Sequence, residues 1–375
     1  MKSNKLFLLV AFALFMAACS NKKSNPADAG NQDLKLKYAQ GFTIDKSKDY
    51  TVVTVLNPWK EKDVYDKYYL VKDTSATVPQ DGKKIVIPLK TVAINSATHL
   101  EFLNLIGNLD KVSGVCNADY IYSPAIIERV EQGKTKNLGD AFNLDIENLL
   151  VLNPNAIMTS AYNAKDENSK KLDRCGIPVI YNIEWQEKTP LGRAEWIKFI
   201  AAFFDKGDLA DSLFNQLEKR YNEAREMAVS APNPPSILSG QDFRGTWSMP
   251  AGQSFNALLF KDAGGSYFYA DNKESGSIPT NIENALVNFN QADIWIGAQA
   301  NTLDELGKTD AKYKLFEAYK KGNVYNYNNR MNATGGNDYW EGAVAHPDLL
   351  LKDLIKIFHP DLLPEYQFTY VKKLE

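Results

Sequence analysis

The chain has 375 residues, of which 44% are hydrophobic and 24% are charged, and its formal net charge at pH 7 is −3. This composition is typical of a globular protein with room for two domains, and the weak negative charge argues against nucleic acid as a partner. After the first eighteen residues no apolar run is long enough to cross a membrane.

The N-terminus is predicted to be a secretory signal. Lys2 and Lys5 precede the apolar run 6–16, and two alanines stand directly before Cys19. This arrangement resembles the lipobox of bacterial lipoproteins, in which the cysteine at the cleavage point is acylated. A plain signal peptide with an incidental cysteine is the alternative. We expect a signal peptide over 1–18, with Cys19 as the lipidated first residue of the mature chain.

Residues 19–33 are polar and small, as expected of a tether, and the folded part is predicted to start near Leu34. The segment 34–90 is predicted to be a β-rich extension, because runs of β-branched and aromatic residues alternate there with turn residues. We interpret these runs as the strands of hairpins, at 50–55, 66–72 and 85–88.

From residue 91 onward, short apolar strands alternate with helices, a pattern typical of a mainly parallel α/β sheet. The segment 91–188 is therefore predicted to be an N-terminal α/β lobe. Its strands are expected at 92–94, 112–115, 156–158 and 179–180, and its helices at 99–106, 146–152 and 166–174.

A mostly helical segment is predicted over 189–230, because large apolar residues recur at helical spacing without a further proline. Gly207-Asp208 is a candidate break within it. The proline-rich stretch 231–235 stops this helix, and a second α/β lobe is predicted over 231–375. The predicted fold class is thus α/β, with two Rossmann-like lobes joined by a long α-helix and a β-rich N-terminal extension.

One seven-residue pattern occurs twice, at 145–151 and at 281–287. Each copy reads as a helix start, with Asp145 or Asn281 as N-cap, and carries a glutamate at its third position. Two similar lobes with matched acidic residues suit a partner with two-fold symmetry. The alternative is that both glutamates only complement the helix dipole, an effect of a few tenths of a kcal/mol.

Three further segments carry a family resemblance that covers about 91–360. They are Ile-Asn-Ser-Ala-Thr-His at 94–99, Glu-Asn-Leu-Leu-Val-Leu-Asn-Pro-Asn-Ala-Ile-Met at 147–158, and Leu-x-x-x-Gly-Ile-Pro-Val at 172–179. In order and spacing the chain resembles the helical-backbone substrate-binding proteins of ABC importers for ferric siderophores, haem and cobalamin. The match departs at His99, where that family has glutamate.

The resemblance implies a partner and a location. In that family the glutamates at the positions of Glu147 and Glu283 dock into basic sockets on the two permease subunits, which work with an ATPase. It further implies a monomer that is anchored through acylated Cys19 to a bacterial membrane and faces the periplasm. Which membrane face the anchor uses stays open.

Ligands of such proteins sit between the lobes, against loops at the carboxyl ends of the strands. Aromatic and cationic residues recur in these loops. We expect ligand contacts from His99, Tyr120, Tyr122, Tyr162, Trp185, Arg244, Trp247, Arg330, Tyr339 and Trp340. The alternative interpretation is that the aromatic residues fill an interface between the lobes instead of contacting a ligand. For the two arginines, the alternative is an ion pair with Asp242 or Asp338.

Arginine beside flat apolar surfaces suits an anionic planar chelate, such as a ferric catecholate, a ferric hydroxamate or haem. We therefore favour an iron chelate, with a corrinoid such as cobalamin as the alternative ligand because it needs fewer charges. The chain has three histidines, so coordination of a bare transition-metal ion is not expected, and no cofactor is predicted.

An enzyme would need a recognisable nucleophile, metal or phosphate motif, and the sequence has no Gly-x-Ser-x-Gly elbow and no His-Glu-x-x-His. We therefore predict a binding protein without catalysis, with a sensing or assembly lipoprotein as a further alternative. Cys116 and Cys175 could pair in an oxidising compartment, but two buried free thiols are the favoured interpretation.

Overall fold

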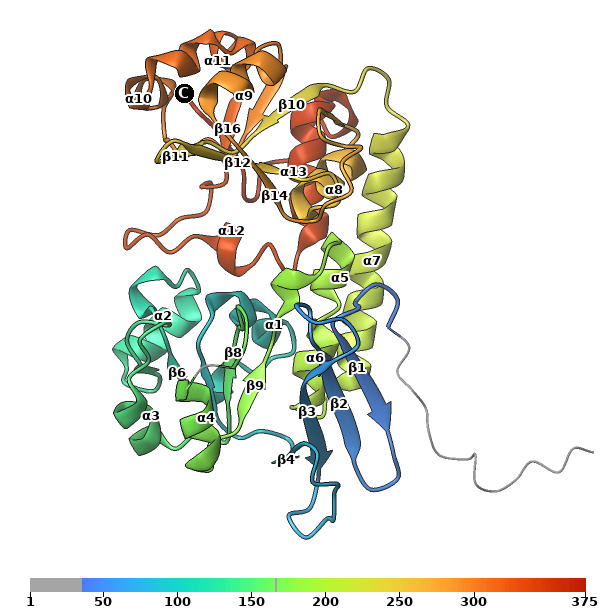
Figure 1. Ribbon diagram of the computed structural model, residues 1–375, viewed down its shortest axis with the longest axis vertical. Coiled ribbons are helices and arrows are strands. Elements are labelled where there is room, and N and C mark those ends of the chain that lie inside the picture. The colour runs from blue at the N-terminus through green and yellow to red at the C-terminus, as the bar shows by residue number, and fades with distance from the viewer. Residues whose placement is uncertain (1–35, 166) are drawn as a thin grey trace, which may run out of the picture.

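The computed structural model describes residues 36–165 and 167–375. Two lobes are stacked along the long axis, and helix α7 (Gly207–Val229) runs beside both of them (Figure 1). The predicted fold class is confirmed, including the β-rich N-terminal extension. The predicted signal peptide and tether, with Cys19, lie outside the described residues. Within the described residues, no helix combines the length and the apolar character that a membrane crossing requires.

The first lobe contains a five-stranded parallel sheet with the order β7-β6-β5-β8-β9. Its strands are β5 (Val92–Ile94), β6 (Val112–Val115), β7 (Lys136–Asn137), β8 (Ile157–Thr159) and β9 (Val179–Tyr181). Its helices are α1 (Leu100–Leu105), α2 (Pro124–Glu131), α3 (Ile146–Leu152) and α4 (Glu167–Arg174). All three residues of the central strand β5 are buried, as expected of a short apolar run in a parallel sheet, and so are those of the edge strand β9.

The connecting segment consists of three helices rather than one long helix. They are α5 (Pro190–Ala194), α6 (Ile197–Ala202) and α7, which begins at the suspected break Gly207. The buried face of α7 repeats every three or four residues and is made of Ala210, Phe214, Leu217, Tyr221, Ala224 and Ala228. The helix α7 contacts α6 of the connecting segment and α8 and α13 of the second lobe.

The second lobe contains a five-stranded sheet with the order β13-β10-β15-β16-β17, parallel except for β17, and a three-stranded antiparallel sheet β11-β12-β14. Its strands are β10 (Ser236–Ser239), β11 (Asp242–Phe243), β12 (Thr246–Pro250), β13 (Ser266–Tyr267), β14 (Ser277–Thr280), β15 (Ile294–Ile296), β16 (Val324–Asn326) and β17 (Lys372–Lys373). Its helices are α8 (Phe255–Asp262), α9 (Ile282–Phe289), α10 (Leu303–Thr309), α11 (Glu317–Lys320), α12 (Asp338–Glu341) and α13 (Pro347–Phe358).

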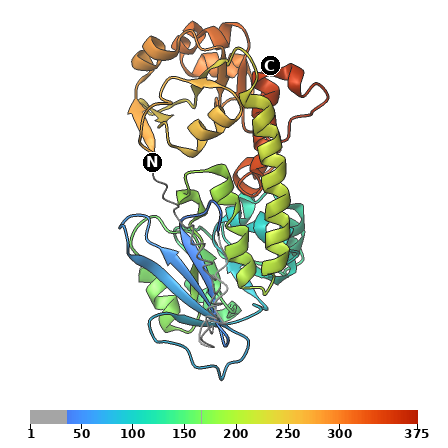
Figure 2. The same ribbon diagram turned by 90° about the vertical axis from the view of Figure 1, so that its right-hand side faces the viewer.

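The N-terminal extension is a four-stranded sheet in sequence order, with β1 (Phe42–Lys46), β2 (Thr51–Leu56), β3 (Val64–Val71) and β4 (Lys83–Val86). The first three strands form the expected hairpins, whereas β4 pairs with β3 in parallel, so the prediction of hairpins throughout is wrong for this strand. The sheet lies against the lower lobe in Figure 2. Phe42 joins it to α6, with its ring centroid 4.7 Å from Trp196 and 5.5 Å from Phe199.

Two buried carboxylates fasten the start of the folded chain to the connecting segment. Glu195 accepts hydrogen bonds from the backbone N–H groups of residues 37–39. Glu187 accepts them from Gln40 and Gly41, and also from the indole N–H of Trp196. Because burying a carboxylate is costly unless it is hydrogen-bonded, these contacts fix residues 37–41 beside α5.

The segment 330–346, which carries α12, belongs to the second lobe in sequence but packs on the first. Asn332 donates its side-chain N–H to the carbonyl of Ile121 at 2.8 Å. The carboxylate of Glu341 accepts the backbone N–H groups of Tyr122 at 2.7 Å and Ser123 at 3.0 Å. The predicted lobe boundary therefore differs from the spatial one, because this segment forms part of the wall of the first lobe.

Candidate ligand-binding cleft

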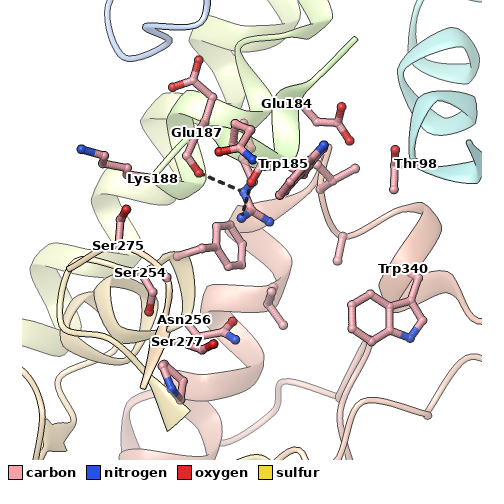
Figure 3. Close-up of a pocket in the computed structure, with 18 of the residues that line it drawn as sticks. Thr98, Glu184, Trp185, Glu187, Lys188, Ser254, Asn256, Ser275, Ser277 and Trp340 are labelled. Carbon is pink, nitrogen blue, oxygen red and sulfur yellow. Dashed lines mark hydrogen bonds between the residues drawn. The ribbon is translucent and has the colours of Figure 1, made fainter. Parts of the chain in front are cut away.

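A cavity of about 590 Å³ lies between the lobes. The first lobe contributes Thr98 and residues 184–188, the connecting segment contributes Arg193, and α12 contributes Tyr339 and Trp340. The second lobe contributes five polar side chains, together with apolar ones such as Phe255 and Leu350; the polar ones are Ser248, Ser254, Asn256, Ser275 and Ser277. Figure 3 shows Ser254, Asn256 and Ser277 across the cavity from Glu184. The cavity is within the size range of small-molecule sites.

Two further hollows extend the cavity along the first lobe. One of about 340 Å³ shares Thr98 and Trp340 with it, and the other, of about 370 Å³, shares Phe142 and Tyr162 with the 340 Å³ hollow. Residues that directly follow β5, β6 and β8 line these hollows, so they follow the carboxyl edge of the parallel sheet. This is the edge at which α/β sheets bind ligands.

An aromatic shelf, defined as Phe142, Tyr162 and Trp185, runs along this edge. The ring centroids of Phe142 and Tyr162 are 5.5 Å apart, as are those of Tyr162 and Trp185, and the interplanar angles are 38° and 34°. Phe142 and Tyr162 are 78% and 60% exposed. Trp340, which is 68% exposed, lies at the point that the main cavity and the hollow of about 340 Å³ share. Contiguous exposed aromatic surface of this kind marks a binding site.

Arg193 is, with Lys188, one of two cations in the cavity wall. Its Nε donates to the carbonyl of Glu187 at 3.2 Å and its Nη2 to the carbonyl of Trp185 at 2.9 Å, contacts that Figure 3 marks with dashed lines. Its guanidinium carbon lies 4.1 Å from the ring centroid of Phe255. Burial lowers the pKa of Arg193, yet an arginine stays charged in a protein. Within the described residues no carboxylate forms a salt bridge with it.

The remaining hydrogen-bonding capacity of Arg193 is available to a ligand. A guanidinium has five N–H donors, and two of them are used by the carbonyls. A half-buried cation without a carboxylate partner is stabilised by an anion that enters the cavity. Sequence reasoning missed Arg193, because it lies inside a predicted helix, four residues after the N-cap Thr189. It also missed Phe142 and the serine hydroxyls.

His99 does not reach the cavity, contrary to the prediction. Its side chain is 0% exposed, and its Nε2 lies 3.6 Å from the Oε2 of Glu184, which is 1% exposed. Burial acts to raise the pKa of Glu184, but the nearby imidazole of His99 outweighs this effect, so this pKa is lowered. His99 therefore lies behind the cavity wall, next to Glu184, which lines the cavity beside Trp185.

The other predicted ligand residues divide into two groups. Trp185, Tyr339 and Trp340 line the main cavity, and Tyr120 and Tyr162 line the hollow of about 340 Å³. These five are brought together around the cleft. Tyr122 lies next to them in the chain, but its contacts are the backbone hydrogen bond to Glu341 and the guanidinium of Arg330, which lies 5.8 Å from its ring centroid.

Three predictions are corrected by the packing. Trp247 is 0% exposed and packs against the ring of Trp295, so it belongs to the core of the second lobe. Arg244 is exposed in the β11–β12 turn, with its guanidinium 5.0 Å from the Phe243 ring centroid. Arg330 forms an ion pair with Asp338 at 2.9 Å, which is the alternative that the sequence allowed. Neither arginine lines the cavity between the lobes.

The two predicted N-caps are confirmed. Asp145 accepts the N–H of Asn148 at 3.0 Å, and Asn281 accepts that of Asn284 at 2.9 Å. The glutamates of both repeats, Glu147 and Glu283, are exposed.

The described cysteines are both free. Cys116 is buried, and burial raises its pKa to about 12, whereas Cys175 is exposed, so the prediction of two buried thiols is wrong for Cys175. Within the described residues, no group of three or more His, Cys, Asp or Glu side chains is placed to hold a metal ion.

A sequence model of the family described as periplasmic binding protein matches residues 92–331. The chain belongs to this family. The match spans both lobes and the connecting helices but leaves out the β-rich extension. The family consists of substrate-binding proteins rather than enzymes, so the general role of this binding protein follows from its membership.

Relatives and solved structures agree with this assignment. An uncharacterized lipoprotein of Methanocaldococcus jannaschii is 25% identical over 361 residues, which cover 90% of this chain and 84% of that protein. The haem-binding protein HutB of Vibrio cholerae has a TM-score of 0.56 at 15% identity, over 72% of this chain and 99% of HutB. The vitamin B12-binding protein BtuF of Vibrio cholerae has a TM-score of 0.53 at 15% identity, over 74% and 99%. At these identities the two structures show a shared fold.

Proposed function

We propose that this binding protein captures an anionic metal chelate between its lobes and delivers it to an ABC permease that works with its ATPase. The favoured ligand is a ferric siderophore or another iron complex with a flat conjugated face. The protein acts as a monomer in the cell envelope, anchored to the membrane through acylated Cys19. It performs no covalent chemistry on its ligand.

The observation that carries this proposal is the position of Arg193. Two backbone carbonyls orient its guanidinium in the cavity wall, and within the described residues it has no carboxylate partner. Charge-assisted hydrogen bonds from arginine to oxygen anions are short and strong, and the guanidinium binds a pair of oxygens in a fixed geometry. The oxygen ligands of a catecholate, a hydroxamate or a haem propionate meet this requirement.

The aromatic shelf supports a ligand with a flat face. Aromatic pairs contribute about 0.5–1.5 kcal/mol beyond the area they bury, and the shelf offers three rings in series. The Nε1 of Trp185 is buried and has no hydrogen-bond acceptor among the described residues, so it can donate to a polar edge of the ligand. The serine hydroxyls of the second lobe face the same space.

Cobalamin is the alternative ligand. The cavity wall has one arginine but many aromatic rings and hydroxyl groups. This lining favours cobalamin, because a corrinoid presents amides and few charges. In a sensing or assembly role, the protein would still bind its ligand but would not dock on a permease. The exposed Glu147 and Glu283 favour transport over that role.

The test is a titration of tryptophan fluorescence in the chain that starts at Ser20, with haem, a ferric catecholate, a ferric hydroxamate and cyanocobalamin. We expect saturable quenching by one iron chelate, and Arg193→Ala to weaken its binding at least about tenfold. Arg244→Ala is the matched control, because it removes an arginine that does not line the cavity. Equal affinities of the two variants would remove the basis for an anionic ligand, and a preference for cyanocobalamin would support the alternative.

A further inference from the structure

The β-rich extension reaches the ligand cleft through one residue of β3. Tyr65, which is 8% exposed, lines the hollow of about 370 Å³, whose other lining residues belong to the first lobe. Its ring meets that of Tyr181 on β9 edge to face, with the centroids 5.0 Å apart and an interplanar angle of 90°. The family match begins at residue 92. The extension therefore supplies a wall of the cleft from outside the part of the chain that matches the family.

The same strand fixes the loop that follows β8. The hydroxyl of Tyr65 donates to the carbonyl of Asn163 at 2.9 Å. The next residue of β3, Asp66, forms an ion pair with Lys165 at 3.1 Å. The loop held by these two contacts carries Tyr162, the middle ring of the aromatic shelf. The extension thus helps to position the shelf as well as to close the hollow.

The charges behind this wall compensate one another. Asp66, which is 7% exposed, pairs with Lys83 at 2.9 Å in addition to Lys165, and Lys83 also pairs with Asp173 at 2.9 Å. Two lysines thus face two carboxylates. Of the described residues that line the hollow, none carries a charge. The hollow differs in this respect from the main cavity, whose wall contains Arg193.

The polar groups of the hollow are amides and hydroxyls. They belong to Asn95, Asn163, Asn168, Thr159, Ser160 and Ser169. Such groups can both donate and accept hydrogen bonds. A charged group that entered the hollow would leave water without gaining a counter-ion, which is costly, whereas an uncharged polar group exchanges its hydrogen bonds to water for hydrogen bonds to the lining. The lining therefore suits an uncharged amide or hydroxyl chain.

We propose that this hollow is a specificity subsite for an uncharged, amide-bearing arm of the bound chelate, and that Tyr65 of the extension closes it. The anionic metal centre lies near Arg193, and the arm follows the aromatic shelf, since Phe142 and Tyr162 belong both to the shelf and to the lining of the hollow. This inference rests on the proposed function and names a part of the ligand that the proposed function leaves open.

The proposal is tested with matched pairs of ferric complexes in the tryptophan fluorescence titration. One pair is a ferric catecholate built from a catechol methylamide, and the same complex with a glycylglycinamide arm in place of the methyl group. The two complexes have the same iron centre and the same charge. A pair of ferric hydroxamates with and without that arm is the second probe. We expect the armed member of one pair to bind at least about tenfold more tightly than its compact partner.

The outcomes separate the subsite from the proposed function. Equal affinities within a pair that binds would overturn the subsite and leave the proposed function standing. Binding of haem alone would also overturn the subsite, because haem has no uncharged polar arm. If no iron complex binds, the proposed ligand class and the subsite fail together.

Filling the hollow should remove the preference for the arm. Ala164 is exposed and lines the hollow, so Ala164→Trp places a large ring there with little effect on the core. We expect this variant to lose the tenfold preference and to bind the compact complex as before. Ala311→Trp is the matched control, because Ala311 is an exposed alanine of the second lobe that does not line the hollow. An undiminished preference in Ala164→Trp would overturn the proposal.

The role of the extension is tested at Tyr65 itself. Tyr65→Phe keeps the ring and removes the hydrogen bond to Asn163, so it should lower the preference for the armed complex about fivefold. Tyr69→Phe is the control, since Tyr69 lies on the same strand and donates to Asp81 away from the hollow. A purely structural role of Tyr65 would weaken both complexes equally, and that result would overturn its assignment to the subsite.

Discussion

The two lobes use aromatic residues in opposite ways. In the second lobe Trp247 and Trp295 are fully buried, and the indole N–H of Trp247 donates to the carbonyl of Ser239 at 2.8 Å. In the first lobe the rings of Phe142 and Tyr162 stay exposed, and the indole N–H of Trp185 has no acceptor among the described residues. The first lobe therefore presents the flat recognition surface. The second lobe keeps these two tryptophans in its own core, and it lines the cleft with hydroxyls and with the ring of Phe255.

The largest effect on stability is expected when a core tryptophan of the second lobe is replaced by alanine. Trp247→Ala should lower the free energy of unfolding by about 3–5 kcal/mol, because it leaves a large cavity and an unpaired carbonyl. Trp340→Ala, at a side chain that is 68% exposed, should change that free energy by no more than about 0.5 kcal/mol. Urea unfolding followed by circular dichroism measures both free energies of unfolding. Equal losses in the two variants would contradict the difference between the buried and the exposed tryptophan.

The contact of α12 with the first lobe should depend on pH. Burial raises the pKa of Glu341 to about 7, well above the value of 4.5 that applies when the chain is unfolded. The folded state therefore holds this proton more tightly, so the contribution is fully present below pH 4.5 and is lost as the pH rises through about 7. We expect Glu341→Gln to flatten the fall in thermal stability between pH 5 and pH 8, and a slope like that of the unaltered chain would contradict the assignment.

The contribution of the aromatic shelf to ligand binding can be measured by removing one ring at a time through substitution. Tyr162→Ala and Phe142→Ala should each weaken ligand binding by about 1 kcal/mol, roughly fivefold, because each removes one stacked partner. Phe243→Ala is the control, since Phe243 is 66% exposed in the second lobe and does not line the cleft. The fluorescence titration measures all three, and a loss in the control as large as in the shelf variants would count against a dedicated surface.

The smallest effect is expected at the hydroxyls of the second lobe. Ser277→Ala should weaken ligand binding by no more than about 1 kcal/mol and leave stability unchanged within about 0.5 kcal/mol. Ser254→Ala should also cost about 1 kcal/mol of stability, since its Oγ caps α8 by accepting the N–H of Ala257. Thermal unfolding separates the two serines, and equal melting temperatures would show that the cap is unimportant.

Much of the fold was predictable because local patterns determine it. The strands at 92–94 and 112–115 and the helix at 146–152 have the predicted bounds. Continuous apolar runs and regular helical spacing mark these elements directly. The small sheet β11-β12-β14 was missed, because its strands are short and mix polar with apolar residues.

The site was less predictable, because burial is a tertiary property. Nothing in the neighbouring sequence separates Trp247, which is buried, from Trp340, which is exposed. Likewise, the contact that brings α12 to the first lobe joins Glu341 to Tyr122 across 219 positions of the chain. Arg193 becomes a cavity cation only when the segment before α7 is folded against Phe255.

The attachment of residues 37–41 to Glu187 and Glu195 has a mechanical consequence. These backbone groups are held where the first lobe passes into the connecting segment. A pull on the chain at Lys37 therefore acts first on Glu187 and Glu195, and through them on the junction between the first lobe and the connecting segment.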